Sequence, residues 1–169
     1  FVDEAAPPVS LKNFALCNIN SLYKLTFWGN IRFEKNFTPD LCNLLSFGGL
    51  TAVSGGIEIA TGNGLLSVNK GTDIESIVCA LCGFKEAGIL VHAYMIFGFY
   101  DETEQGLIDS IETLRQLFLF GLIDSAFWHK FTLTRHSTLY KKWQEGKCKD
   151  LKPVIKNQKN LFANNDIHF

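Results

Sequence analysis

Residues 88–98 have the sequence Gly-Ile-Leu-Val-His-Ala-Tyr-Met-Ile-Phe-Gly, a nearly unbroken apolar run between two glycines. Such a run is typical of a parallel strand that is covered on both faces. A helical pattern ends at Gly88, and a second one begins after Asp101. The stretch therefore predicts one strand between two helices, the unit from which α/β folds are built.

The same alternation extends along the chain. Strands are expected at Leu22–Phe33, Leu50–Ile57, Ile89–Phe97 and Ser125–Thr134. Helices are expected at Pro7–Ile19, Thr38–Gly48, Leu65–Lys70, Thr72–Gly88 and Asp101–Gly121, with Thr38, Thr72 and Asp101 at their N-caps. The connections are long enough for right-handed crossovers. The pattern predicts an α/β fold with a parallel sheet, either barrel-like or open.

Composition narrows the class of protein. The 169 residues are 47% apolar, and 16 basic residues against 17 acidic ones give a net charge of -1. This balance argues against non-specific nucleic-acid binding, which needs a basic excess. No apolar run reaches the roughly 18 residues of a membrane span. The five cysteines are an odd number, which favours free thiols and a cytoplasmic location.

The two ends of the sequence suggest a piece of a longer chain. The sequence begins at Phe1, and Met95 is its single methionine. The first residues resemble the end of a strand, and the last ones stop without a glycine, a proline or a charged tail. We therefore expect an excised segment.

Acids, an arginine and glycines follow the predicted strands. Because ligands of α/β folds bind at the carboxyl ends of the strands, these side chains are candidates for a binding site. Carboxylates suit an ammonium group or ribose hydroxyls, and arginine suits a carboxylate. The pattern favours a zwitterionic, hydroxyl-bearing ligand, with candidates at Asp3, Glu4, Arg32, Gly55, Gly56, Glu58, Asp101, Glu102, His129 and His136.

Simpler interpretations stay open for several of these residues. Glu58 fits equally well as an acid at a helix start, and Asp101 fits better as an N-cap. His92 fits best as a hydrogen-bonded core histidine unless it faces a barrel lumen. The pair Cys79 and Cys82 lies within a helical pattern, so buried helix cysteines are a better interpretation than a metal site.

Glycine pairs raise the question of a phosphate loop. Gly55-Gly56 and Gly62-x-Gly64 are close together, but their spacing is not that of a P-loop, and no Gly-Lys-Ser/Thr follows. A phosphate-binding barrel enzyme is therefore kept as the weakest of three hypotheses.

A family resemblance joins these observations. The segments Val53-Ser-Gly-Gly-Ile-Glu58, Ala87–His92 and Tyr94–Phe99 resemble the fourth and fifth strands of the radical S-adenosylmethionine superfamily. More narrowly, Phe1–Ala5 and Ser125–His129 resemble Fe–S oxidoreductases that often carry an upstream cobalamin-binding domain. The resemblance implies a partial (βα) barrel of the TIM-like type that lacks its first strand. It places the truncated barrel at residues 1–140 and an incomplete C-terminal extension at 141–169.

The resemblance also implies roles for matched positions. Asp3 and Glu4 would contact the methionine amino group of S-adenosylmethionine, and Arg32 would lie near its carboxylate. Glu58 would face the ribose or the amino-acid moiety.

The remaining matched positions belong to the adenine and substrate ends of the site. Ile96 and Gly98 would pack on adenine, with Glu102 as the later glutamate of the fifth-strand motif. Relatives usually have proline where this chain has Tyr100. His129 and His136 would lie near the substrate end of the lumen.

One departure from the family is large. The family binds a 4Fe–4S cluster through a C-x3-C-x2-C loop, and this spacing does not occur here. We expect the parent protein to supply these cysteines upstream, with cobalamin as an optional cofactor and flavodoxin or ferredoxin as reductant. We expect the 169 residues alone to be inactive and to self-associate through an exposed sheet edge. The competing hypothesis is a non-redox ligand-binding module with the same fold.

Overall fold

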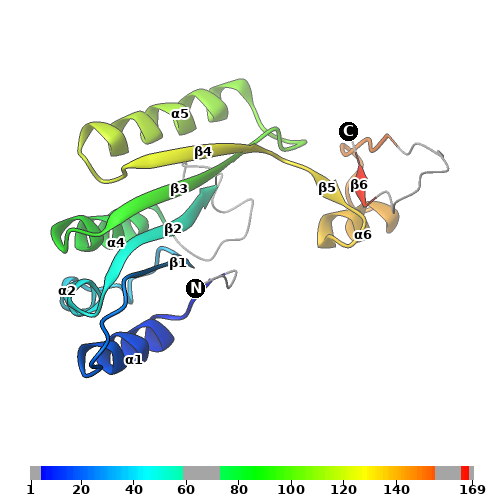
Figure 1. Cartoon of the computed structure of the whole chain (residues 1–169). Helices are drawn as coiled ribbons and strands as arrows, with labels where there is room; N and C mark the ends of the chain where they lie inside the picture. The colour runs from blue at the N-terminus through cyan, green and yellow to red at the C-terminus, as the bar shows by residue number, and fades with distance from the viewer. Residues whose placement is uncertain (1–4, 59–72, 155–164, 168–169) are drawn as a thin grey trace.

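The computed structural model describes residues 5–58, 73–154 and 165–167. Their elements (Figure 1) are α1 (Pro8–Ile19), β1 (Phe27–Ile31), α2 (Pro39–Phe47), β2 (Leu50–Glu58), α4 (Ile74–Glu86), β3 (Leu90–Phe97), α5 (Glu104–Leu119), β4 (Ser125–Lys130), β5 (Leu133–Thr134), α6 (Thr138–Gln144) and β6 (Asp166–Ile167). The expected helix at Leu65–Lys70 lies outside the described residues. None of the helices within these ranges is both long and apolar enough to cross a lipid bilayer.

Strands β1 to β4 form one sheet in the order β1-β2-β3-β4, and all three neighbouring pairs are parallel. This confirms the predicted α/β class with a parallel sheet. The expected self-association through a sheet edge stays a prediction, and at the β1 edge the Ala6 N–H donates to the Asn30 carbonyl at 2.7 Å.

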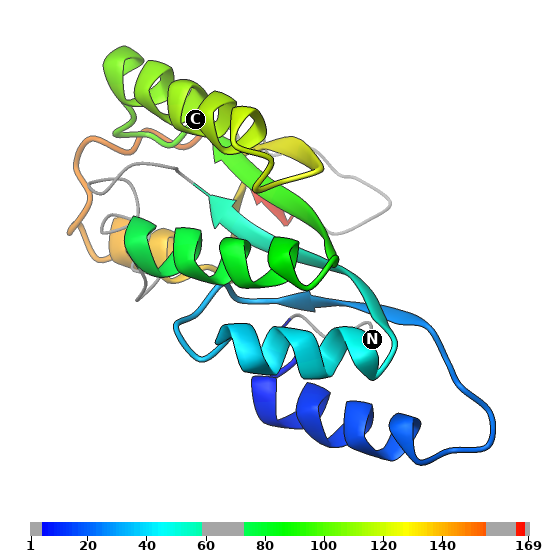
Figure 2. The same ribbon diagram turned by 90° about the vertical axis from the view of Figure 1, so that its left-hand side faces the viewer.

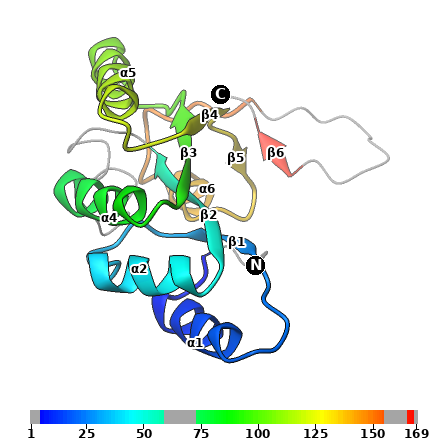
Figure 3. The same ribbon diagram turned by 60° about the vertical axis from the view of Figure 1, so that its left-hand side comes forward.

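Helices α1, α2, α4 and α5 lie side by side along one face of the sheet (Figures 2 and 3). Val91, Ala93 and Met95 of β3 are buried in the core on this side, whereas His92 and Tyr94 between them are half-buried. Successive residues of a strand point to opposite faces. The prediction that this strand is covered on both faces is therefore wrong, because only its helix side is fully buried.

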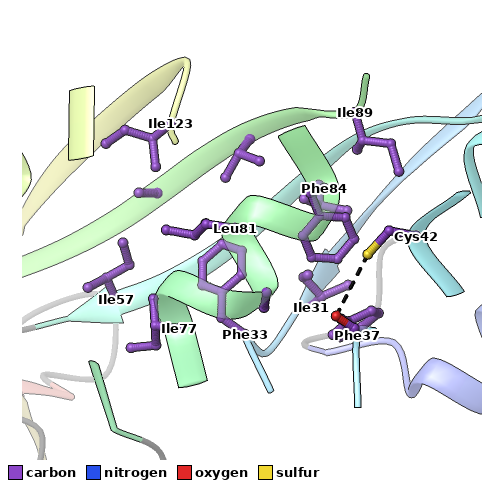
Figure 4. Close-up of a cluster of buried hydrophobic side chains, with 14 of the residues drawn as sticks. Ile31, Phe33, Phe37, Cys42, Ile57, Ile77, Leu81, Phe84, Ile89 and Ile123 are labelled. Atoms are coloured by element: carbon purple, nitrogen blue, oxygen red, sulfur yellow. Dashed lines mark hydrogen bonds between the residues drawn. The ribbon is translucent and has the colours of Figure 1, made fainter. Parts of the chain in front are cut away.

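Helix α4 supplies the centre of the core. Its Ile77, Leu81 and Phe84 recur at helical spacing and are at most 1% exposed. Figure 4 shows these side chains between the strands and α2, and the Phe84 ring lies 5.0 Å from that of Phe37. Burial of each such side chain stabilises the fold by roughly 1.5–3 kcal/mol.

Two of the three expected N-caps are displaced along the sequence. Thr38 caps α2 as predicted, with its side chain accepting a backbone N–H. Helix α4 is capped by Asp73 instead of Thr72, and α5 by Thr103 instead of Asp101. In both places a second side chain with a short polar group follows the predicted cap, and it accepts the hydrogen bond that the helix start requires.

Two strands are shorter than predicted. The strand expected from Leu22 begins only at Phe27, because its partner β2 begins at Leu50, which pairs with Phe27. The strand expected over Ser125–Thr134 ends at Lys130, the residue that pairs with the last residue of β3. The following β5 pairs antiparallel with β6 in a separate two-stranded sheet.

Beyond β4 the chain forms a second, smaller unit, which we define as residues 131–154 and 165–167. Its own buried cluster is formed by Leu133, Tyr140, Leu151 and Ile167. The division expected at residue 140 stays a prediction, although α6 runs from Thr138 to Gln144 across it.

The amino edge of the sheet carries an ion pair that predicts a pH effect. The Asp124 carboxylate accepts hydrogen bonds from Lys85 Nζ and from the Val91 N–H, each at 2.7 Å. Burial acts to raise the pKa of Asp124, but the ammonium and the N–H outweigh it, so that the pKa is lowered. A depressed carboxyl pKa contributes stability above the unfolded-state value of about 4, and this stability is lost as the pH falls through the folded-state value.

We therefore expect the free energy of unfolding to fall as the pH decreases below about 4, and the Asp124→Asn variant to lose part of this dependence. Urea unfolding at a series of pH values measures it. An unchanged acid slope in Asp124→Asn would contradict the assignment, and Asp109→Asn on the exposed side of α5 serves as the control.

Candidate functional site at the carboxyl edge of the sheet

The four parallel strands end at one edge of the sheet. In Figure 1 the arrowheads of β2, β3 and β4 point toward the side where β5, β6 and α6 lie. We call the predicted residues at this edge the rim: Arg32, Glu58, Ile96, Gly98, Glu102 and His129. Asp3 and Glu4, which were predicted to join them, lie outside the described residues.

Glu58 ends β2 in an unusual backbone conformation. The pairing between β2 and β3 shifts between Gly56 and Glu58, so that Glu58 pairs with Met95. Its φ is 63°, and among the described residues it alone has a positive φ without being glycine. Left-handed conformation costs a residue with a side chain roughly 1–2 kcal/mol. Such strained positions are concentrated at functional sites.

Gly98 follows β3 in a second left-handed conformation, with a φ of 84°. Its N–H donates to Glu102 Oε2 at 2.6 Å. A Cβ at Gly98 would meet no atom closer than Lys130 Cγ at 3.7 Å. The glycine is therefore required by its φ and not by crowding within the protein.

Glu102 closes the turn after β3. While Oε2 accepts the Gly98 N–H, Oε1 is buried and has no hydrogen-bond partner within the described part of the chain. A buried carboxylate oxygen without a donor is costly. This oxygen is therefore a place where a donor from a bound ligand or a water molecule would be stabilising.

Arg32 follows the last residue of β1. Its side chain is half-exposed, and its Nε lies 3.8 Å from Glu34 Oε1. A guanidinium at this exposed edge can donate two parallel hydrogen bonds to a carboxylate of a ligand. Arg32, Glu58 and Gly98 therefore stand at the ends of three neighbouring strands.

The two predicted histidines lie in different units. His129 is in β4 beside Ile96 of β3, and its ring lies 5.6 Å from that of Tyr94. His136 is exposed in the turn between β5 and α6 of the second unit. His129 thus belongs to the rim, whereas His136 belongs to a different part of the structure.

A row of rings lies on the sheet face opposite the helices, and of its members sequence reasoning named His92 and His129 but missed Tyr94 and Phe127 as part of one surface. His92 Nδ1 lies 2.7 Å from Ser125 Oγ, and its ring lies 4.8 Å from that of Tyr94. Phe127 is 55% exposed and lies 4.6 Å from the ring of His129. In β3 the ring-bearing His92 and Tyr94 alternate with Val91, Ala93 and Met95, and this alternation could have indicated a ring-lined face. It was overlooked because tyrosine was counted among the apolar residues of a continuous apolar run.

Position also bears on the alternatives for Gly55 and for the cysteine pair, whereas Gly62 and Gly64 lie outside the described residues. Gly55 lies within β2, where a Cβ would be 2.7 Å from the Phe33 ring, so packing explains this glycine. The prediction that Cys79 and Cys82 are buried is wrong, since Cys79 is exposed and Cys82 is half-buried on α4. Within the described ranges no three metal-binding side chains come together.

The fold is shared with two solved structures. The chain superposes on the radical S-adenosylmethionine methyltransferase TsrM from Kitasatospora setae, solved with cobalamin and a [4Fe-4S] cluster, with a TM-score of 0.59 and 18% identity. It superposes on OxsB, a cobalamin-dependent S-adenosylmethionine radical enzyme solved with aqua-cobalamin, with a TM-score of 0.58 and 14% identity.

The likeness covers 75% of this chain and 25% of TsrM, and 83% of this chain and 20% of OxsB. The chain thus spans a quarter or less of the structures it resembles. No protein-family model and no curated protein sequence matches it. The chain has the partial α/β barrel fold of these two enzymes.

Proposed function

We propose that this chain is the S-adenosylmethionine-binding part of a radical enzyme that acts on a substrate of unknown identity. The observation that carries the proposal is the pair of left-handed residues, Glu58 and Gly98, at the ends of neighbouring strands. They occur in a fold shared with a radical S-adenosylmethionine methyltransferase and a cobalamin-dependent S-adenosylmethionine radical enzyme. The sequence resemblance supports the same assignment independently.

Four of the six rim residues then have a role in binding. Ile96 and the backbone at Gly98 pack against adenine, and Gly98 permits the close approach. Glu58 accepts hydrogen bonds from ribose hydroxyls or from the amino group, and Arg32 binds the carboxylate of the methionine moiety. Asp3 and Glu4 are proposed to bind the same amino group.

The residues of this chain do not fit a 4Fe–4S cluster. The sequence has no C-x3-C-x2-C spacing, and Cys17, Cys42 and Cys79 lie on three different helices of the outer layer. We therefore assign the cluster ligands to cysteines outside these 169 residues and derive no electron-transfer step from this chain. The contribution of its own residues is to bind and orient S-adenosylmethionine.

The type of reaction is proposed only in general terms. The resemblance in sequence implies an oxidoreductase, whereas one of the two structural neighbours is a methyltransferase. Both neighbours contain cobalamin, and we propose it as an optional cofactor of the parent protein. Flavodoxin or ferredoxin is proposed as the reductant, and a cytoplasmic location is proposed with it.

A non-redox binding module is the second candidate function. The missing cysteine spacing favours it. Both candidates bind a ligand at the rim, but only the first predicts reductant-dependent formation of 5′-deoxyadenosine by a protein that includes a cysteine triplet. If the complete gene of the parent protein encodes no C-x3-C-x2-C sequence, the non-redox binding module becomes the better-supported function.

Two glycine variants test the proposed site. Gly98 and Gly88 both have positive φ, 84° and 74°, and neither has an atom within 3.4 Å of an added Cβ. Gly98→Ala and Gly88→Ala should therefore each lose about 1–2 kcal/mol of stability. Gly88 is at the amino edge, so that only Gly98→Ala should weaken binding of S-adenosylmethionine, by about tenfold for a lost close contact.

Isothermal titration calorimetry of the chain with S-adenosylmethionine measures both variants against the wild type, and urea unfolding checks that they lose similar stability. Equal affinities of Gly98→Ala and Gly88→Ala would remove Gly98 from the site.

A further inference from the structure

The turn after β3 is held from the second unit as well as from within. We call residues 98–103 the rim loop. Inside it, the Gly98 N–H binds Glu102 Oε2 at 2.6 Å, and the Glu102 N–H donates to the Phe99 carbonyl at 3.1 Å. These bonds fix Gly98 and Glu102, both predicted to bind the ligand, relative to each other. They do not fix the loop relative to the rest of the protein.

A first external contact lies at the end of β3. The Phe131 N–H donates to the Phe97 carbonyl at 2.7 Å. The rings of Phe131 and Phe99 are stacked, with centroids 4.3 Å apart and an interplanar angle of 20°. The bond to Phe97 continues the pairing of β3 with β4, whereas the stacking on Phe99 is a contact between the rim loop and the first residue of the second unit.

A second external contact is made by Tyr100. Its side chain packs against the buried cluster of the second unit, beside partly buried residues that include Trp143 and Cys148. Burial is the main cause that raises the pKa of Tyr100, with the neighbouring Asp101 adding to it. Tyr100 therefore remains a neutral ring, suited to packing in an apolar cluster, across the ordinary pH range.

These contacts surround the position that the proposed function uses. Phe99 and Tyr100 both contact the second unit, through the Phe131 ring and the buried cluster, and Gly98 directly precedes them. Gly98 has no side chain, and the side-chain hydrogen bond described for it is the one from its N–H to Glu102 Oε2 within the same loop. Its position is therefore determined by its neighbours.

We propose that the second unit acts as a clamp that holds the rim loop in its ligand-binding conformation, with Tyr100 and Phe99 as positioning residues. The proposal rests on the assignment of the rim as the S-adenosylmethionine site. It gives a reason for tyrosine at position 100, where the relatives named by the sequence resemblance usually have proline. A proline fixes a turn through its own ring, whereas here an aromatic anchor in a second core fixes it from outside.

Amide hydrogen exchange of the full 169-residue chain tests the clamp without any ligand. Removal of the anchor in Tyr100→Ala should accelerate exchange at Gly98 and Glu102 by about tenfold or more, because the loop opens locally. Exchange at Val53 in β2 should stay unchanged. Tyr100→Phe keeps the ring that packs against the cluster and should stay within about threefold of the wild type.

Two further variants separate the clamp from a general loss of stability. Tyr23→Ala removes a tyrosine that is 83% exposed and should change nothing. Leu151 is 1% exposed and belongs to the buried cluster of the second unit, not to the rim loop. Leu151→Ala therefore opens a cavity in the second unit without changing the loop itself. It should accelerate exchange at Gly98 as Tyr100→Ala does, because the clamp is weakened from its far side.

Titration with S-adenosylmethionine supplies the functional readout. Tyr100→Ala is expected to weaken its affinity by about tenfold, with recovery in Tyr100→Phe. Unchanged exchange at Gly98 in Tyr100→Ala, or faster exchange with full affinity, would overturn the clamp. Absence of binding by the wild type would instead overturn the proposed function. The ligand-free exchange results would then still show whether the second unit holds the rim loop.

Discussion

Replacement of Phe84 with alanine is expected to lower the free energy of unfolding by about 3–5 kcal/mol. Phe84 is fully buried in α4, with the Phe37 ring 5.0 Å away. Figure 4 shows it surrounded by side chains from strands and helices alike. The cavity cannot collapse easily, because close-packed neighbours on several elements would have to move together.

Urea unfolding followed by circular dichroism measures this loss. Phe47→Ala is the matched control, because Phe47 is 80% exposed at the end of α2, and it should change stability by less than about 0.5 kcal/mol. Equal losses in the two variants would contradict the core described for α4.

Asn18→Ala is expected to lower the free energy of unfolding by about 2–4 kcal/mol, since it leaves several backbone groups without partners. The Asn18 side chain is 6% exposed. Its Nδ2 donates to the carbonyls of Leu25 and Gly48, each at 2.7 Å, and its Oδ1 accepts the Leu25 N–H at 3.0 Å. One amide thereby joins α1, the segment before β1 and the end of α2.

Asn20→Ala provides the control for this prediction. Asn20 is exposed, and its side chain makes one hydrogen bond to the carbonyl of Leu16. The loss should be below about 1 kcal/mol. A thermal-unfolding comparison in which Asn18→Ala is no less stable than Asn20→Ala would contradict the bridging role of Asn18.

The order of the described elements from α1 to β4 could be predicted because each signal is local, whereas β5, α6 and β6 were not predicted. In helix α4, Ile77, Leu81 and Phe84 recur every three to four residues, which is the period of an α-helix. Strand β3 is an apolar run between two glycines. The parallel arrangement follows from the crossover lengths. Arg32, Glu58 and Gly98 lie at the carboxyl ends of the strands as expected, because this edge is fixed once the sheet is parallel, and their role in binding stays a prediction.

What could not be predicted depends on contacts distant in sequence. The partners of Asn18 are 7 and 30 residues away, so that no short pattern marks it. The left-handed Glu58 arises where β2 shifts its pairing against Met95, and the sequence of β2 alone does not show this shift. The end of β4 is set by the length of β3, which explains why Leu133 and Thr134 joined a different sheet.

The clearest test of the rim as the ligand site is a nitrogen-15 NMR titration of the 19.0 kDa chain with S-adenosylmethionine. Glycine amides mark both edges of the sheet: Gly56 and Gly98 at the carboxyl edge, and Gly49, Gly88 and Gly121 at the amino edge. We predict saturable shifts at Gly56, Gly98 and Glu58 and none at the amino edge. Shifts confined to the amino-edge glycines, or no shifts at saturating ligand, would contradict the account.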